Sequence, residues 1–286
     1  MHPFDPRLTP ARDDVAAKHL QGRVQAARFV DGVAYEVVAP QAPVRLAPRP
    51  DAPLATEALA GERVVIYQSD AEGWSWGQLE SDRYVGYLPS EALGAPGAPP
   101  THRVAALRTL VFPGPSIRLP PLGALPLGAT LAVTRVQDRL AVTSTGGHVP
   151  AAHLAPIGQH EGDFVAVAER FLGVPYLWGG KTALGIDCSG LVQVAVSASG
   201  MACPRDSDMQ EAALGIPVDP GSDLSDLRRG DLVFWEGHVG IVSERGSLLH
   251  ANAFHMAVAV EPIAEAVARI GDGGSNITAV RRIARR

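Results

Sequence analysis

Short alternating runs of apolar and polar residues fill the part of the chain that follows residue 30. The runs YEVVAP, VRLAP, ERVVIYQ, GWSWGQLE and YVGYLP lie between residues 35 and 93, and each is closed by Gly, Pro or Asp. A period of two over four to eight residues predicts half-buried β-strands, and these closing residues favour turns. We therefore expect a small antiparallel β domain over residues 31–96.

A second set of strand-like runs begins after a linker. The stretch GAPGAPPTH, residues 94–102, is dense in Pro and Gly, which supply neither ladder donors nor core side chains. Beyond it, RVAALRTLVFPG, ATLAVTRVQDRLAVTST and GGHVPAAHLAP repeat the order of the first set, and both sets end in a strand, a Pro and an Ala/Leu turn. The repetition predicts a duplicated module, with a second β domain at residues 101–157.

Helical patterns occur at both ends of the chain. Asp13 and Asp14 precede VAAKHLQGRV, whose apolar positions have helical spacing, so we expect a helical arm over residues 1–30. After residue 158, EGDFVAVAERFLG and CSGLVQVAVSASG predict two helices around a Gly-rich loop, and DLVFWEGHVGIVSERGSLLHAN and MAVAVEPI then predict strands. This order indicates an α+β domain over residues 158–286.

Composition and charge exclude several classes of function. The 286 residues have a net charge of −5, so the chain offers no basic field to hold a nucleic acid. Its two cysteines, Cys188 and Cys203, cannot build a disulfide framework, which fits a reducing compartment. Neither a signal-peptide pattern nor a run of 18 apolar residues is present. We therefore expect a cytoplasmic protein without a membrane partner. The sequence leaves the oligomeric state open, and a monomer is our working expectation.

Cys188 is the candidate nucleophile. It follows a Gly-rich loop and begins a predicted helix, where free N–H groups and the helix dipole favour a thiolate. His238 lies in GHVGIV and His250 in LLHAN. If these two strands pair, one histidine can act as base to the thiol while the other orients it. The alternative is an inert buried cysteine with histidines that only pack.

Six runs in this domain carry a specific resemblance. PYLWGG, DCSGLVQ, PRDSDMQ, GDLVFW, GHVGIV and HANAFHMAV together resemble the NlpC/p60 family of peptidoglycan peptidases over residues 160–262. The resemblance implies a papain-like fold with Cys188 as nucleophile, His238 as base and His250 as the third, orienting member. His255 is a competing candidate for the third place.

The resemblance also implies residues that bind the substrate. Asp206 and Ser207 would hold the substrate's backbone and the groups near its carboxylate, although a helix N-cap at these two residues is an alternative. The N–H of Ser189, at the start of the helix, would donate to the oxyanion. Trp178 would form a wall of the cleft, and Cys203 is expected to be structural.

The duplicated module resembles the two bacterial SH3-like domains that precede the peptidase in γ-D-glutamyl-L-diamino acid endopeptidases. That arrangement implies cleavage of murein tripeptides or tetrapeptides with a free N-terminal L-Ala, on the carbonyl side of D-Glu. A substrate ammonium needs a carboxylate, which Asp187 can supply. The resemblance implies that Glu57 and Tyr84 close the same pocket, with Glu62 and Tyr87 open as replacements.

The expected chemistry needs no cofactor or metal, because the chain has no His-x-x-x-His or paired-cysteine ligand set. Three other functions remain open. The chain could be an amidase or acyltransferase with the same fold, or a cell-wall binding protein with an inactive peptidase half. A redox protein is disfavoured because Cys188 has no resolving cysteine in a C-x-x-C spacing.

Overall fold

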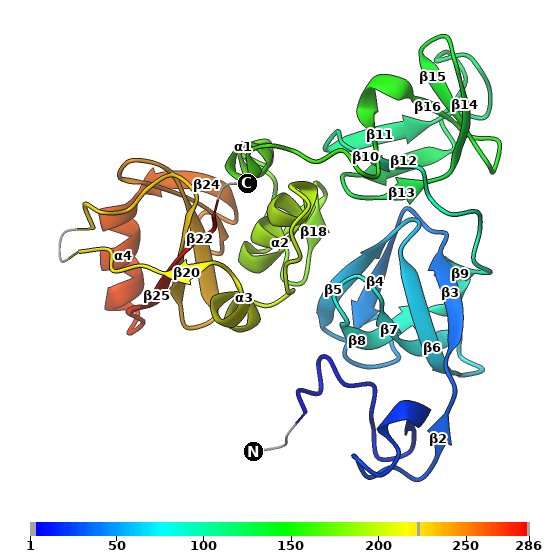
Figure 1. Ribbon diagram of the computed structural model, residues 1–286, viewed down its shortest axis with the longest axis horizontal. Coiled ribbons are helices and arrows are strands. Elements are labelled where there is room, and N and C mark those ends of the chain that lie inside the picture. The colour runs from blue at the N-terminus through cyan, green and yellow to red at the C-terminus, as the bar shows by residue number, and fades with distance from the viewer. Residues whose placement is uncertain (1–3, 222–223, 285–286) are drawn as a thin grey trace. The chain divides into compact units, whose positions relative to one another are not determined.

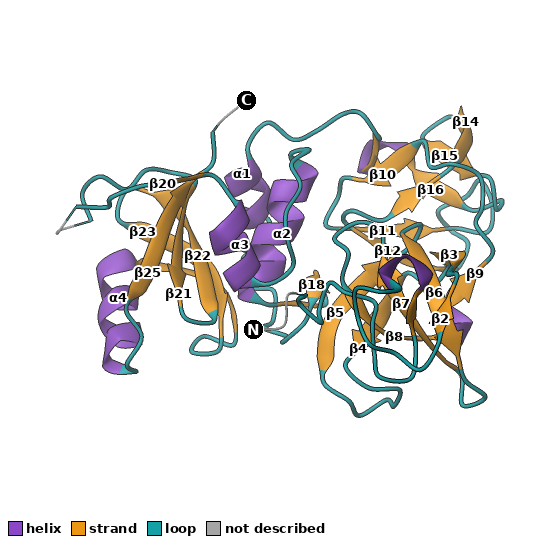
Figure 2. Cartoon of the chain, turned by 60° about the horizontal axis from the view of Figure 1, so that its bottom comes forward, coloured by secondary structure: helices purple, strands orange, loops and turns teal. Residues whose placement is uncertain are grey.

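The computed structural model describes residues 4–221 and 224–284. The chain divides into two compact units, Met1–Gly158 and Gln159–Arg286. The first unit is built from strands and short 3-10 turns, whereas the α-helices lie in the second unit (Figure 2). The second unit contains Cys188, His238 and His250.

The N-terminal segment is mostly extended, so the predicted helical arm is wrong. It contains β1 (Ala16–Ala17), a single 3-10 turn η1 (Lys18–Leu20) and β2 (Phe29–Val30), and β1 pairs in parallel with β2. Val15, Ala16 and Ala17 are all fully buried, and three consecutive buried residues do not fit one face of a helix. Gly22, with a φ of 80°, follows the turn in a conformation that continues no right-handed helix.

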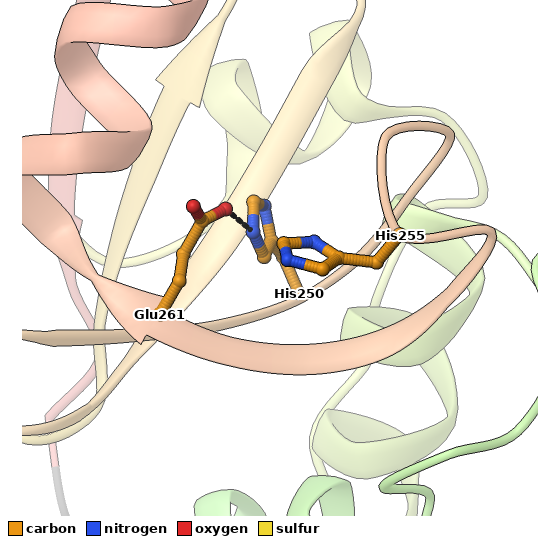
Figure 3. Close-up of side chains that lie close together, drawn as sticks. All are labelled: His250, His255 and Glu261. Atoms are coloured by element: carbon orange, nitrogen blue, oxygen red, sulfur yellow. Dashed lines mark hydrogen bonds and ion pairs between the residues drawn. The ribbon is translucent and has the colours of Figure 1, made fainter.

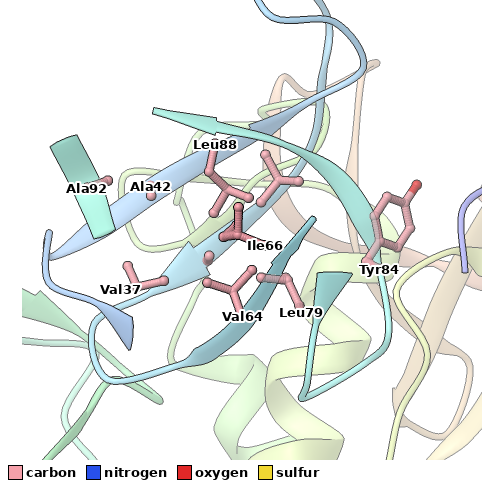
Figure 4. Close-up of a cluster of buried hydrophobic side chains, with 10 residues drawn as sticks. Val37, Ala42, Val64, Ile66, Leu79, Tyr84, Leu88 and Ala92 are labelled. Carbon is pink, nitrogen blue, oxygen red and sulfur yellow. The ribbon is translucent and has the colours of Figure 1, made fainter. Parts of the chain in front are cut away.

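The first β module is a seven-stranded antiparallel sheet within the described part of the first unit, in the order β5-β4-β8-β7-β6-β3-β9. Burial alternates along β4 and β6, as the period-two pattern predicts. The inward side chains form an apolar cluster that includes Val64, Leu79 and Leu88 (Figure 4). The elements are β3 (Val33–Val37), β4 (Gln41–Arg45), β5 (Leu54–Leu59), β6 (Arg63–Ser69), β7 (Trp74–Leu79), β8 (Val85–Pro89), η2 (Ser90–Ala92) and β9 (Leu93–Gly94).

The second β module consists of short strands in three small sheets, ordered β13-β10-β17, β11-β12 and β14-β15-β16. Its elements are β10 (His102–Val104), β11 (Arg108–Val111), β12 (Gly123–Pro126), β13 (Thr130–Leu131), β14 (Val133–Gln137), β15 (Leu140–Thr143), β16 (His148–Pro150), η3 (Ala151–His153) and β17 (Leu154–Pro156). Both modules end in a strand, a 3-10 turn and a short last strand. This shared ending corresponds to the repetition seen in the sequence, and the assignment of the second module as SH3-like stays a prediction.

The second unit is α+β. Its helices and its β18–β19 hairpin are α1 (Phe164–Glu169), β18 (Lys181–Thr182), β19 (Gly185–Ile186), α2 (Cys188–Ala198), α3 (Ser207–Ala213) and α4 (Ile263–Asp272). Its main sheet, as far as the unit is described, has the order β20-β25-β21-β22-β23-β24. These strands are β20 (Ile216–Pro217), β21 (Asp231–Trp235), β22 (His238–Glu244), β23 (Ser247–Asn252), β24 (Ala257–Pro262) and β25 (Ile277–Arg282).

Helices cover both faces of this sheet. Within the unit, α2 and α3 lie on one side of the sheet and α4 lies on the other (Figures 1 and 2). All five residues of β21 are buried, because neither face of that strand meets water. Among the described residues, no helix is both long and apolar enough to cross a lipid bilayer.

Candidate active site

The candidate nucleophile lies in the first turn of a buried helix. Cys188 is the first residue of α2, and the Asp187 side chain caps the helix by accepting a hydrogen bond of 2.7 Å from the Gly190 N–H. The chain packs tightly here, because a Cβ at position 190 would lie 2.3 Å from the carbonyl oxygen of Gly180. Cys188 itself is only 7% exposed. Its place is therefore fixed by backbone contacts on both sides of the thiol.

The two predicted histidines lie on neighbouring strands and contact each other. His238 begins β22, His250 lies on β23, and these strands pair antiparallel. The Nε2 atom of His238 is 2.8 Å from the Nδ1 atom of His250, and the ring centroids are 5.1 Å apart. Because Nε2 of His238 is occupied by this hydrogen bond, Nδ1 is the ring nitrogen left for the thiol.

Burial of the thiol opposes the thiolate form that the start of the helix favours. Burial raises the pKa of the Cys188 thiol to about 12, and the Asp187 carboxylate adds to the rise. Hydrogen bonds from the backbone N–H groups of Val239 and Ser189 lower the pKa, but by less than burial raises it. The Val239 contact also places the sulfur beside β22, next to His238.

Both histidines are neutral at neutral pH. Burial lowers the pKa of His238, and the nearby His250 and Arg269 lower it further, while Glu261 acts in the opposite direction. Burial also lowers the pKa of His250, with Arg269 and His255 adding to the effect. The resting site therefore holds a neutral thiol and neutral imidazoles, so a base with a free lone pair is available to accept the thiol proton.

Asp187 is bound by a buried arginine that sequence reasoning did not assign. Arg205 donates through Nη1 to Oδ1 at 2.9 Å and through Nη2 to Oδ2 at 2.7 Å. The Gly179 N–H donates to Oδ2 at 2.8 Å, and Arg205 is 1% exposed. The charge of Asp187 is thus already balanced, and a substrate ammonium would have to share this carboxylate. The predicted role of Asp187 towards the ammonium stays a prediction.

The other predicted residues of this unit surround the start of α2 and α3. The Ser189 hydroxyl accepts a hydrogen bond of 2.9 Å from Arg205 Nη1, and its backbone N–H faces the Cys188 sulfur. Asp206 occupies the N-cap position of α3, as the N-cap alternative predicted, although its side chain makes no capping hydrogen bond. Ser207 begins α3, and Trp178 is 68% exposed in the loop before β18.

Glu57 and Tyr84 belong to the other unit. Glu57 lies on β5, is 5% exposed and accepts a hydrogen bond of 2.8 Å from Gln41 Nε2. Tyr84 is 4% exposed and lies at the edge of the apolar cluster, with its hydroxyl directed away from the other labelled side chains (Figure 4). Their part in closing a pocket near Cys188 stays a prediction.

The alternative pair, Glu62 and Tyr87, also has hydrogen-bond partners within the first unit. Oε2 of Glu62 accepts a hydrogen bond of 2.8 Å from the Leu59 N–H. The Tyr87 hydroxyl accepts one of 2.6 Å from Arg12 Nη1. Glu57 is hydrogen-bonded within its module in the same way, so which acid and which tyrosine close the pocket stays a prediction.

Three side chains near the histidine pair have the composition of a metal site. In the part of the chain that the structure describes, ligand atoms of His250, His255 and Glu261 lie within 4.8 Å of one another (Figure 3). Both ring nitrogens of His250 already make hydrogen bonds, and the Arg269 guanidinium bonds the Glu261 carboxylate. A metal ion bound here would have to break a hydrogen bond of His250, and the positive charge of Arg269 would repel it. The three side chains therefore fit a hydrogen-bonded network better than a metal site.

Glu261 and Arg269 were not found by sequence reasoning. Nε2 of His250 is 2.7 Å from Oε1 of Glu261, and Arg269 bonds the same oxygen. His255, the competing third member, is exposed and bonds Asn252 through both its backbone N–H and its ring. The only signal for Glu261 in the sequence is an acid placed late in the strand-like run MAVAVEPI.

Two family models match segments of the chain. Residues 173–269 match the NlpC/P60 family, and residues 44–93 match the bacterial dipeptidyl-peptidase SH3 domain. Over 124 residues, the chain is 34% identical to a gamma-D-glutamyl-L-lysine dipeptidyl-peptidase of Bacillus subtilis, covering 39% of this chain and 40% of the relative. It is 28% identical over 229 residues to the peptidoglycan endopeptidase RipB of Mycobacterium tuberculosis, covering 74% of this chain and 89% of RipB.

The fold has a solved counterpart. A crystal structure of an NlpC/P60 family protein from Bacillus cereus has a TM-score of 0.73 and 19% identity, and the match covers 87% of this chain and 99% of that one. The match to the first three curated relatives spans between 31% and 40% of their own lengths. The thiol and histidine pair lie within the matched segment of the second unit. Residues 173–269 are therefore an NlpC/P60 domain, joined in one chain to a segment of the dipeptidyl-peptidase SH3 type.

Proposed function

We propose that the chain is a cysteine endopeptidase that hydrolyses the bond between γ-D-Glu and an L-diamino acid in murein peptides with a free N-terminal L-Ala. The observation that carries the proposal is the 2.8 Å contact between His238 Nε2 and His250 Nδ1, which leaves Nδ1 of His238 for the thiol of Cys188. The family match and a relative named for γ-D-glutamyl-L-lysine cleavage support the same substrate class.

The first half-reaction would form a thioester. His238 Nδ1 takes the proton of Cys188 while the sulfur attacks the γ-carbonyl carbon of D-Glu, and the carbonyl oxygen accepts a hydrogen bond from the Ser189 N–H. The carbon–nitrogen bond then breaks, and His238 returns the proton to the departing amine. Because the thiol pKa is raised and the histidine pKa is lowered, proton transfer accompanies attack instead of preceding it.

The second half-reaction would release the shortened peptide. A water molecule gives a proton to His238 and attacks the thioester carbon, and the carbon–sulfur bond breaks. The Cys188 thiolate takes the proton back from His238, which restores the neutral pair. No redox partner is needed, since every bond change is a substitution at a carbonyl carbon.

Substrate selection would depend on the free amine. An ammonium group removed from water needs a nearby carboxylate, and Asp187 is the acid next to the nucleophile. Glu57 and Tyr84 are our candidates for the second acid and the hydroxyl of this pocket. Asp206, Ser207 and Trp178 would bind the rest of the tripeptide or tetrapeptide. Such an enzyme would recycle murein fragments in the cytoplasm, acting as a monomer.

Mass spectrometry of the tripeptide L-Ala-γ-D-Glu-meso-diaminopimelate and its L-lysine analogue tests the proposal. Each peptide is supplied with a free or an N-acetylated amine, to wild type, to Cys188→Ser and to the matched control Cys203→Ser. We expect free diamino acid only from unblocked peptides, and only with wild type and Cys203→Ser. Equal cleavage of acetylated peptides would refute the amine requirement, and full activity of Cys188→Ser would refute the nucleophile.

A further inference from the structure

The hydrogen-bonded network of the site continues beyond the two histidines. His250 is 1% exposed, and both of its ring nitrogens have partners: Nδ1 contacts His238, and Nε2 contacts Oε1 of Glu261 at 2.7 Å. Figure 3 shows the Glu261 carboxylate directed at the His250 ring. The buried imidazole therefore joins an acid on one strand to the base on another.

Strand register places Glu261 beside His250. On β23 and β24, Leu248 pairs with Glu261 and His250 pairs with Ala259. Glu261 is thus the diagonal neighbour of His250 on the same face of the sheet, a distance that a long side chain can span. The contact follows from the antiparallel pairing of the two strands and needs no distortion of either.

Arg269 fixes Oε1 of Glu261 as a hydrogen-bond acceptor. This side chain comes from α4, bonds Oε1 of Glu261 through Nη2, and stacks over the Phe254 ring at 4.3 Å. A guanidinium cannot accept a hydrogen bond, so the carboxylate oxygen must be the acceptor in that pair. The same oxygen is therefore an acceptor towards Nε2 of His250 as well.

This chain of contacts fixes where each proton lies. Since Glu261 accepts, Nε2 of His250 carries its proton, and the neutral His250 ring has its lone pair on Nδ1. Nδ1 of His250 must then accept from Nε2–H of His238, which leaves the lone pair of His238 on Nδ1. We propose that Glu261, held by Arg269, is a positioning residue that sets the tautomers of both histidines so that His238 can accept the thiol proton.

The proposal gives Glu261→Leu a specific effect. Leucine has no acceptor, so a proton on Nε2 of the buried His250 would lose its hydrogen-bond partner. That proton would move to Nδ1, where Nε2 of His238 can accept it, and both tautomers would reverse. His238 would then present N–H to the thiol instead of a lone pair. A wrong tautomer in a serine-protease triad lowers kcat by roughly 10⁴-fold, so we expect a kcat loss of about 100-fold or more with an unchanged KM.

Side-chain ¹⁵N NMR of the substrate-free protein tests the proposal without relying on the peptidase reaction. In wild type we expect His250 protonated on Nε2 and His238 on Nε2. In Glu261→Leu both protons should move to Nδ1, whereas the exposed control Glu265→Leu on α4 should keep the wild-type pattern. A wild-type spectrum with the His250 proton on Nδ1 would overturn the proposal, even if the variant failed to fold.

Kinetics then separate this inference from the proposed function, on which its catalytic part rests. Alkylation of Cys188 by iodoacetamide at pH 7.5 should slow at least 10-fold in Glu261→Leu and stay unchanged in Glu265→Leu, whatever peptide the enzyme cleaves. Glu261→Asp, which keeps an accepting carboxylate, should recover part of the rate. Normal tautomers and alkylation in Glu261→Leu would refute the positioning role, whereas expected tautomers without murein cleavage would refute only the proposed substrate.

Discussion

Arg205 and Asp187 form a buried, bidentate ion pair, with Nη2 of the arginine 2.7 Å from Oδ2 of the aspartate. Asp187 directly precedes the nucleophile, Cys188. The same aspartate caps α2, so the pair ties the helix that carries Cys188 to the segment that precedes α3. The position of the thiol therefore depends on a charge pair that water hardly reaches.

Replacing Arg205 by methionine should destabilise the protein strongly, because the carboxylate of Asp187 would stay buried without its cation. Breaking a buried pair in this way costs roughly 3–5 kcal/mol. Urea unfolding measures the change, and the exposed pair of Lys18 and Asp31 supplies the control, since Lys18→Met should cost about 0–1 kcal/mol. Equal losses in the two variants would contradict the importance of the buried pair.

The reactivity of Cys188 should keep rising with pH. Its thiol has a pKa of about 12, so the thiolate fraction grows throughout the range in which the protein can be studied. The rate of alkylation by iodoacetamide, with the rate of Cys188→Ser subtracted to remove Cys203, should increase from pH 7 to pH 10. A plateau reached already at pH 5 would indicate a preformed thiolate–imidazolium pair and contradict the raised pKa.

Stability should fall as the solution is made acidic below the ordinary histidine pKa of 6.5. His238 and His250 have lowered pKa values in the folded protein, so below pH 6.5 the unfolded chain binds protons that the folded chain does not. The free energy of unfolding, measured in urea between pH 7.5 and 5, should therefore decrease. His250→Gln should show a shallower decrease, and an identical slope would argue against burial of a neutral His250.

Asp163 should stabilise α1 as its N-cap. Its Oδ1 accepts hydrogen bonds from the N–H groups of Val165 and Ala166, and Arg229 bonds its other oxygen. Asp163→Ala should cost about 0.5–2 kcal/mol in urea unfolding. Asp163→Asn keeps a capping oxygen and loses only the charge, so it should cost less than alanine. Equal costs in the two variants would mean that the ion pair with Arg229 matters more than the cap.

The sequence predicts the parts of this fold that depend on local patterns. The apolar positions of CSGLVQVAVSASG and the stop at Gly200 indicate α2, and the alternation in the first module indicates its strands. The N-terminal segment was misread because Val15, Ala16 and Ala17 are buried by tertiary packing and not by one helical face. The sequence of such a short segment does not show whether its apolar residues are buried on one helical face or by packing against other parts of the fold.

In the candidate site, the sequence pattern predicts the contact between residues on two strands that follow each other directly along the chain. His238 and His250 are close because β22 and β23 form a hairpin, which the turn residues between them indicate. The bond of Arg205 to Asp187 and that of Glu261 to His250 depend on how separate segments pack, so no spacing rule finds them. The raised pKa of Cys188 is likewise a product of burial, which the helix start alone does not show.

The close approach of Gly190 to the Gly180 carbonyl has a consequence for sequence variation at this site. A side chain at position 190 would meet a backbone oxygen at 2.3 Å and Oδ1 of Asp187 at 2.9 Å, and the backbone has no flexible end that can move aside. The first turn of α2 would have to shift and take Cys188 with it. In a library randomised at position 190 and selected for catalysis, only glycine should survive.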